Sequence, residues 1–151
     1  MTRLAGQLSQ HKAHYMKKHI FLIDDDEDEL EIFDEALKTL PLPCKCTYAD
    51  SADHAMQMLQ YLTPDLIFID INMPKLNGFD FLTEIKKNAH LKDIPLFMYS
   101  NGIDKEIQAK AIKMGAAGCI KKSNSIKSLT EDLRKIVGLS FQSLNSSNLP
   151  L

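Results

Sequence analysis

The sequence predicts an α/β fold in which a five-stranded parallel sheet lies between two layers of helices. Five short apolar runs alternate with segments whose apolar residues recur at helical spacing. Two of the runs, at 20–23 and 66–69, are wholly apolar, as expected of strands buried on both faces. A chain of 151 residues is long enough to bury such a core without disulfides or metals.

The elements follow one another in a regular order. Ile20 to Ile23 form the first expected strand, and Leu30, Phe33, Leu37 and Leu40 then recur at helical spacing until Pro41 stops the helix. Residues 44–49 form the second strand and 52–59 the second helix. Prolines precede the next two apolar runs. The remaining strands are expected at 66–70, 96–100 and 118–121, and the remaining helices at 78–88, 103–114 and 126–136.

Right-handed crossovers between successive strands produce a parallel sheet covered on both faces. The second strand carries Lys45 and Thr47 and therefore suits an edge. These points favour a flavodoxin-like (βα)5 three-layer sandwich with strand order 2-1-3-4-5. In such sheets, ligands bind at the carboxyl ends of the strands, beside the point where the strand order reverses.

The chain is expected to contain one domain, at 18–138. Residues 1–17 have basic residues and no acid and are expected to form a disordered leader, part of which lies upstream of a second possible start at Met16. Residues 139–151, rich in Ser and Asn, are expected to form a flexible tail. We therefore expect no DNA-binding output domain.

Composition excludes several classes of protein. A net charge of -2 argues against a nucleic-acid binder, and no apolar run approaches the roughly 20 residues that span a bilayer. Three cysteines without a secretory signal indicate a reducing, cytoplasmic location and no disulfide framework.

Chemistry-bearing side chains follow four of the five strands. Asp24 and Asp25 come after the first strand, Asp70 after the third, Ser100 ends the fourth and Lys122 follows the fifth. The predicted fold brings these residues into one pocket. Three carboxylates together form a hard oxygen site that suits Mg²⁺.

A lysine and a hydroxyl beside such a site are suited to an anionic group. An aspartate can attack phosphorus and form an aspartyl-phosphate, a reaction that asks the protein mainly for positioning and charge neutralisation. Asp70 is the best nucleophile because it is the lone acid at the end of the central strand. Lys122 would supply a mobile positive charge, and Ser100 a hydrogen bond.

The chain from Lys18 to Gly138 resembles the receiver domain of two-component response regulators. The motifs that carry the resemblance are Asp24-Asp25, the segment 70–78 with sequence DINMPKLNG, Ser100, and GAAG at 115–118 leading to Lys122. The resemblance implies that Asp70 accepts the phosphoryl group. It further implies that Asp25 binds Mg²⁺ directly, that Asp24 binds it through water and that Asn72 contributes its backbone carbonyl. Ser100 and Lys122 match residues that contact the phosphoryl group.

Three residues depart from the family pattern, and one of them, Asn101, is larger than the usual Ala or Gly and is expected to narrow access to Asp70. Ser123 stands where the family usually has a proline in a cis peptide, and a cis bond before a non-proline residue costs about 2.5–4 kcal/mol. We therefore expect either a trans bond or a strained cis one. Cys119 stands where many receivers have a Tyr or Phe that swings inward on activation, and a thiol cannot copy that movement.

The other acids after the first strand have simpler interpretations. Asp24, Asp26, Asp28 and Glu35 match EF-hand spacing, but Glu29 occupies the position that needs glycine. The run from 26 to 31 is more typical of an acid-rich first helical turn. Only Asp24 and Asp25 are therefore predicted to be functional.

The leading prediction is a single-domain response regulator, not a turnover enzyme. It receives a phosphoryl group from a histidine kinase or phosphotransfer protein and signals through a downstream protein, with no nucleic-acid or membrane partner. The alternative is a phosphorylation-independent pseudo-receiver that acts as an interaction module. A phosphatase of the haloacid dehalogenase type would need an acid two residues after Asp70, where this chain has Asn72.

Overall fold

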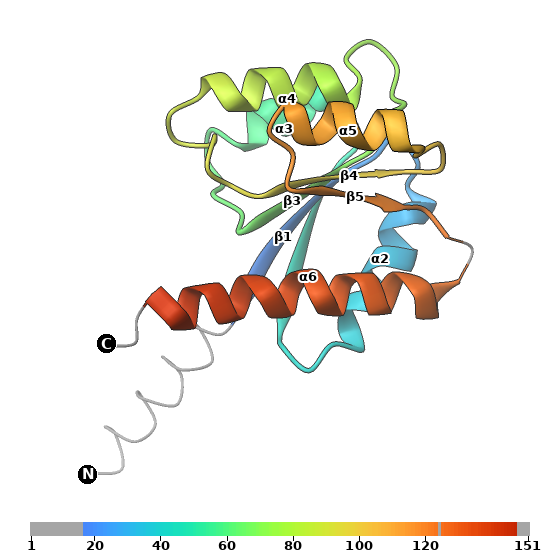
Figure 1. Cartoon of the computed structure of the whole chain (residues 1–151), viewed down its shortest axis with the longest axis vertical. Helices are drawn as coiled ribbons and strands as arrows, with labels where there is room; N and C mark the ends of the chain where they lie inside the picture. Colours follow the sequence, from blue (N-terminus) through green and yellow to red (C-terminus); the bar gives the residue numbers. More distant parts are fainter. Residues whose placement is uncertain (1–16, 124, 148–151) are drawn as a thin grey trace.

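The computed structural model describes residues 17–123 and 125–147, and five strands alternate with five helices in this part of the chain (Figure 1). The strands are β1 (Lys18–Ile23), β2 (Cys44–Ala49), β3 (Leu66–Ile69), β4 (Leu96–Ser100) and β5 (Gly118–Lys121). The helices are α2 (Asp28–Lys38), α3 (Ala52–Met58), α4 (Gly78–Lys87), α5 (Lys105–Lys113) and α6 (Ile126–Ser147).

The strand order is β2-β1-β3-β4-β5, and every neighbouring pair is parallel, so the predicted flavodoxin-like topology is confirmed. The edge position predicted for the second strand is also confirmed. The register pairs Ile23 of β1 with Ile69 of β3. Because these paired residues are the last of their strands, the acids that follow them leave the sheet side by side.

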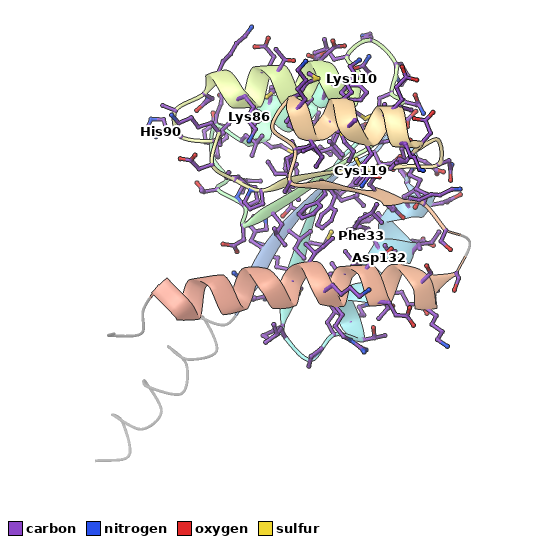
Figure 2. All side chains as sticks on the ribbon, viewed as in Figure 1. Phe33, Lys86, His90, Lys110, Cys119 and Asp132 are labelled. Atoms are coloured by element: carbon purple, nitrogen blue, oxygen red, sulfur yellow. The ribbon has the colours of Figure 1, made fainter. Side chains whose placement is uncertain are left out.

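Helices cover both faces of the sheet and complete three layers (Figure 1). Helices α3, α4 and α5 lie on one face, over a core that includes Phe81 and Met98. Helices α2 and α6 lie on the other face, over a second core. Figure 2 shows Phe33 in the space between the sheet and α6, where its ring makes edge contacts with Phe68 and Tyr99 at centroid distances of 5.1 and 5.5 Å.

Several predicted element ends differ from the structure. Strand β3 ends at Ile69, so Asp70 lies just beyond it. Helix α5 is shorter than the predicted 103–114, and helix α6 continues to Ser147, well past the predicted end at 136. No proline lies between Ile126 and Ser147, and a single glycine at 138 weakens a helix without ending it. Residues 1–16 of the expected leader and 148–151 of the expected tail lie outside the described residues.

None of the described helices combines the length and the apolar character that crossing a membrane requires.

Candidate functional site

Three carboxylates meet at the carboxyl ends of β1 and β3. Oxygen atoms of Asp24, Asp25 and Asp70 all lie within 4.8 Å of one another. Asp24 is fully buried and Asp70 is 6% exposed, whereas Asp25 is exposed. Backbone hydrogen bonds extend the sheet to this point, because the Asp70 amide donates to the Ile23 carbonyl at 3.0 Å. The proximity of the three acids follows directly from the register of the two strands.

Short turns fix the direction of two of these carboxylates. Oδ1 of Asp24 accepts a hydrogen bond from the Asp26 amide at 3.0 Å, and Oδ1 of Asp70 accepts one from the Asn72 amide at 3.1 Å. Aspartates commonly bond the backbone two residues ahead in this way. The hydroxyl of Tyr48, on β2, donates to the Asp24 carbonyl. In both aspartates the other oxygen, Oδ2, takes part in a different contact.

That contact is with Lys122, whose side chain is 8% exposed. Its Nζ lies 2.7 Å from Oδ2 of Asp24 and 3.1 Å from Oδ2 of Asp70. Burial alone would lower the pKa of Lys122, but the hydrogen bonds and charges of the two aspartates outweigh it and raise that pKa. Lys122 is thus a buried ammonium ion. Its neighbour Lys121 is exposed, as its place on the strand predicts.

The peptide bond between Lys122 and Ser123 is trans, because no cis peptide occurs among the described residues. A trans bond was one of the two forms expected. It still delivers the lysine to the acids, so the proline of the family pattern is not needed to bring Lys122 into the pocket.

Ser100 lies at the same edge of the sheet, and only 1% of its surface is exposed. Its hydroxyl accepts a hydrogen bond from the side-chain amide of Asn72 at 3.4 Å. Within the described part of the chain no hydrogen bond joins Ser100 to Asp70. Asn72 therefore connects the two, with its backbone on Asp70 and its side chain on Ser100.

Glu29 and Tyr99 also belong to this pocket, and the sequence analysis missed both. Glu29 was assigned to the solvated first turn of a helix, but its Oε1 lies 3.9 Å from Lys122 Nζ, and its Oε2 accepts a 2.9 Å hydrogen bond from the Tyr99 hydroxyl. Tyr99 is fully buried, and burial followed by the bond to Glu29 raises its pKa. One signal was available: a tyrosine inside an apolar strand requires a polar partner.

Cys119 lies on the face of the sheet that α3, α4 and α5 cover (Figure 2). It packs against the core beneath these helices, and burial raises the pKa of its thiol. Tyr99 belongs to the core under α2 and α6. The aromatic residue that reaches the acids is thus on a different strand, and on a different face, from the position that Cys119 occupies.

The segment after Asp70 is held close to it by helix α4. The amide of Gly78 donates to the Ile71 carbonyl at 3.0 Å. Asn77 and Asp80 form a reciprocal capping box at the start of the helix. Lys75 has a φ of 66°, in the left-handed region that few residues with side chains adopt. The loop that carries Asn72 is therefore closed by several specific interactions.

A surface cavity of about 400 Å³ opens beside the exposed carboxylate of Asp25. Its walls come from the loop after β3, including Met73 and Lys75, and from the start of α3, including Ser51 and His54. The acid cluster is therefore reachable from solvent on the side of Asp25.

The donor set fits a small hard dication. Carboxylate oxygens are the ligands that Mg²⁺ prefers, and it commonly binds one or two of them together with water. Oδ2 of Asp24 is buried and, among the described residues, meets Lys122 as an ion pair without a well-aligned hydrogen bond. A buried oxygen that is incompletely satisfied and surrounded by like charges would gain from a cation.

The buried carboxylate has a measurable effect on stability in metal-free buffer. Burial raises the pKa of Asp24 to about 6, and the contact with Lys122 lowers it by less. The folded protein then binds more protons than the unfolded chain between about pH 4 and 6, so its free energy of unfolding should fall as pH rises through that window. We expect Asp24→Asn to increase that free energy by about 1 kcal/mol at pH 7, because Lys122 keeps Asp70 as a partner.

Urea unfolding with a chelator at pH 4.5 and pH 7 checks this expectation. Asp25→Asn, at an exposed position, is the matched control and should change the pH dependence much less. An Asp24→Asn variant that is less stable than the wild type at pH 7 would show that the ion pair with Lys122 outweighs the cost of burial.

Comparison with known proteins points in the same direction as the geometry. A family model described as the response regulator receiver domain matches residues 20–134. The response regulator Rcp1 of Synechocystis sp. is 26% identical over 140 residues, which cover 88% of this chain and 93% of Rcp1. Protein RcaC of Microchaete diplosiphon is 30% identical over 96 residues, which are 64% of this chain but 14% of RcaC. The chain thus spans a small part of some relatives and nearly all of another.

Solved structures are similar in fold as well. The phosphorylated cyanobacterial phytochrome response regulator RcpA matches with a TM-score of 0.74 and 27% identity, over 84% of this chain and 96% of RcpA. The Mn²⁺-bound form of Rcp1 matches with a TM-score of 0.68 and 27% identity, over 79% of this chain and 91% of Rcp1. Both likenesses therefore extend over most of the chain.

Proposed function

Since the chain belongs to the response regulator receiver domain family of two-component signalling, we propose that it accepts a phosphoryl group on Asp70. An oxygen of the Asp70 carboxylate attacks phosphorus. The bond between phosphorus and a histidine nitrogen of the donor breaks, and its electron pair stays on that nitrogen. The product is an aspartyl-phosphate, and hydrolysis later restores the carboxylate.

The observation that carries this proposal is the surroundings of Asp70. A buried ammonium ion, Lys122, lies 3.1 Å from its Oδ2, and two further carboxylates lie within 4.8 Å. Phosphoryl transfer depends on positioning and on neutralising the charge of the phosphoryl oxygens. Lys122 supplies a positive charge for one of these oxygens, and Ser100 a hydroxyl donor once it turns from Asn72.

A divalent cation completes the site in this proposal. Asp24, Asp25, Asp70 and the backbone carbonyl of Asn72 would hold Mg²⁺, which neutralises phosphoryl oxygens when it is bound. The proposal draws support from the 4.8 Å cluster of the three acids and from the Mn²⁺-bound form of the relative Rcp1. Without a cation, three carboxylates would repel the incoming dianion.

The phosphoryl donor is a sensor histidine kinase or a phosphotransfer protein, and the output is a contact with a downstream protein. Phosphorylation converts the Asp70 carboxylate, with one negative charge, into an acyl phosphate with about two, and an added charge of about -1 beside buried groups can shift a local two-state equilibrium. The protein acts as a switch that is set and reset, not as an enzyme with turnover.

Mass spectrometry after incubation with acetyl phosphate and Mg²⁺ tests the proposal. We expect the intact protein to gain the mass of one phosphoryl group, and the Asp70→Asn variant to gain none. Asp65→Asn, at an exposed position just before β3, is a matched control and should gain the group as the wild type does. Wild-type protein that gains no mass would favour the phosphorylation-independent interaction module instead.

A further inference from the structure

Lys122 has two partners that both change role during the proposed reaction. Its Nζ contacts Oδ2 of Asp24 at 2.7 Å and Oδ2 of Asp70 at 3.1 Å. In the proposed function, Asp24 turns part of its charge to the cation and Asp70 becomes an acyl phosphate. An ammonium ion with 8% of its side chain exposed then exchanges its carboxylate partners for an oxygen of the incoming phosphoryl group, and a negative charge that takes no part in the reaction would hold it in place meanwhile.

A third carboxylate is available on the other side of the ammonium. Oε1 of Glu29 lies 3.9 Å from Lys122 Nζ, about 1 Å beyond hydrogen-bond distance. An ammonium has three donors; among the described residues one of them bonds Asp70, while Asp24 is held as an ion pair, so a donor remains for Glu29. Among the described residues, the group of acids that could share a metal contains Asp24, Asp25 and Asp70 but not Glu29. Glu29 therefore stays available to Lys122 when a cation binds.

The position of Glu29 is fixed by a residue from the interior of the sheet. The Tyr99 hydroxyl donates to Oε2 at 2.9 Å across 70 positions of sequence. Tyr99 is fully buried, and its ring lies against Phe33 of the same helix that carries Glu29, at a centroid distance of 5.5 Å. The ring also lies 5.3 Å from Lys122 Nζ. Tyr99 thus contacts both Glu29 and Lys122.

We propose that Glu29, oriented by the Tyr99 hydroxyl, is a positioning residue that holds the Lys122 ammonium over the pocket while the phosphoryl group is transferred to Asp70. Glu29 touches neither the reacting atoms nor the cation and acts through Lys122. This inference rests on the proposed function, because it concerns the same site. It assigns a role to a side chain that the motif of strand-end residues does not include.

A simpler interpretation is that Glu29 only satisfies a buried tyrosine. The two interpretations differ in what they require of the side chain. A hydrogen-bond acceptor is enough for Tyr99, and the amide oxygen introduced by Glu29→Gln provides one. A negative charge is needed to hold the Lys122 ammonium. Glu29→Gln therefore separates a structural role from a positioning role.

The experiment measures the initial rate of phosphorylation by acetyl phosphate at saturating Mg²⁺, together with the Mg²⁺ concentration that gives half the maximal rate. We expect Glu29→Gln to lower the maximal rate about tenfold, as for loss of an opposite charge about 4 Å from the ammonium. The half-saturating Mg²⁺ concentration and the melting temperature should stay close to those of the wild type. Tyr99→Phe, which frees Glu29 but keeps its charge, should lower the rate by about threefold.

Glu31→Gln is the matched control, because Glu31 is an exposed acid in the same helical turn. It should leave the rate unchanged. Equal rates for Glu29→Gln and Glu31→Gln, with active wild-type protein, would overturn the positioning role and leave the proposed function standing. A shift in the half-saturating Mg²⁺ concentration that accounts for the loss would overturn it too, since Glu29 would then act on the cation. Inactive wild-type protein would refute the proposed function itself.

Discussion

Lys122→Met is expected to slow phosphorylation of Asp70 by acetyl phosphate about a hundredfold or more. The substitution keeps a long apolar side chain but removes the ammonium that lies 3.1 Å from Oδ2 of Asp70. Loss of one preorganised donor to developing charge typically costs a factor of about 10² to 10³ in rate. The measurement is the initial rate at saturating Mg²⁺, followed by the mass of the intact protein.

Lys122→Met should not weaken cation binding, although it slows phosphorylation. The ammonium, 2.7 Å from Asp24, competes with any cation in the pocket, so the variant is expected to bind Mg²⁺ at least as tightly as the wild type. Isothermal titration with Mg²⁺ measures this and also shows that the variant is folded. Lys121→Met is the control, since its side chain is exposed. A variant at 122 that reacts as fast as the one at 121 would contradict the role given to Lys122.

Gly78→Ala is expected to lower the free energy of unfolding by about 2 to 4 kcal/mol. A Cβ atom at this position would lie 2.7 Å from the backbone oxygen of Asp70 and 2.9 Å from the Cα of Ile71. Both are backbone atoms and cannot rotate away as a flexible side chain could. Chemical denaturation followed by circular dichroism gives the difference directly.

The same substitution should reduce phosphorylation in the fraction that remains folded, because relief of the clash moves the backbone of Asp70. Gly102→Ala provides the comparison, since a Cβ there meets nothing within 4 Å. We expect it to change the free energy of unfolding by no more than about 0.5 kcal/mol. Similar losses for both variants would mean that the approach of α4 to Asp70 is looser than the distances indicate.

The sequence was sufficient to predict the sheet and the residues at its strand ends. The runs at 20–23 and 66–69 contain only apolar residues, as strands that are buried on both faces require. They could therefore be identified as central strands without any knowledge of the neighbouring segments. Parallel topology then places Asp24 and Asp70 together. Strand order and the meeting of the three acids required no knowledge of side-chain packing, and the structure confirms both.

Glu29 could not be found in this way because its role depends on a contact across 70 positions of sequence. A glutamate in the first turn of a helix has a sufficient local explanation in the helix dipole. Only the packing of α2 against the sheet shows that this glutamate faces Lys122 while Glu31 is exposed to water. The end of α6 was missed for a related reason. The Ser and Asn residues after position 139 suggested a flexible tail, although no helix-breaking residue ends the helix before Ser147.

Side chains alternate between the two faces of the sheet along β4, so two neighbouring residues lie in different hydrophobic cores. Tyr99 points into the core shared with α2 and α6, whereas Met98 points into the core beneath α5, and Ser100 follows with the parity of Met98. A movement of Lys122, which lies beside Tyr99, would consequently affect the layer of α2 and α6, and a movement of the Ser100 hydroxyl would affect the opposite layer. Phosphorylation at this edge of the sheet could in this way change the two helical layers independently.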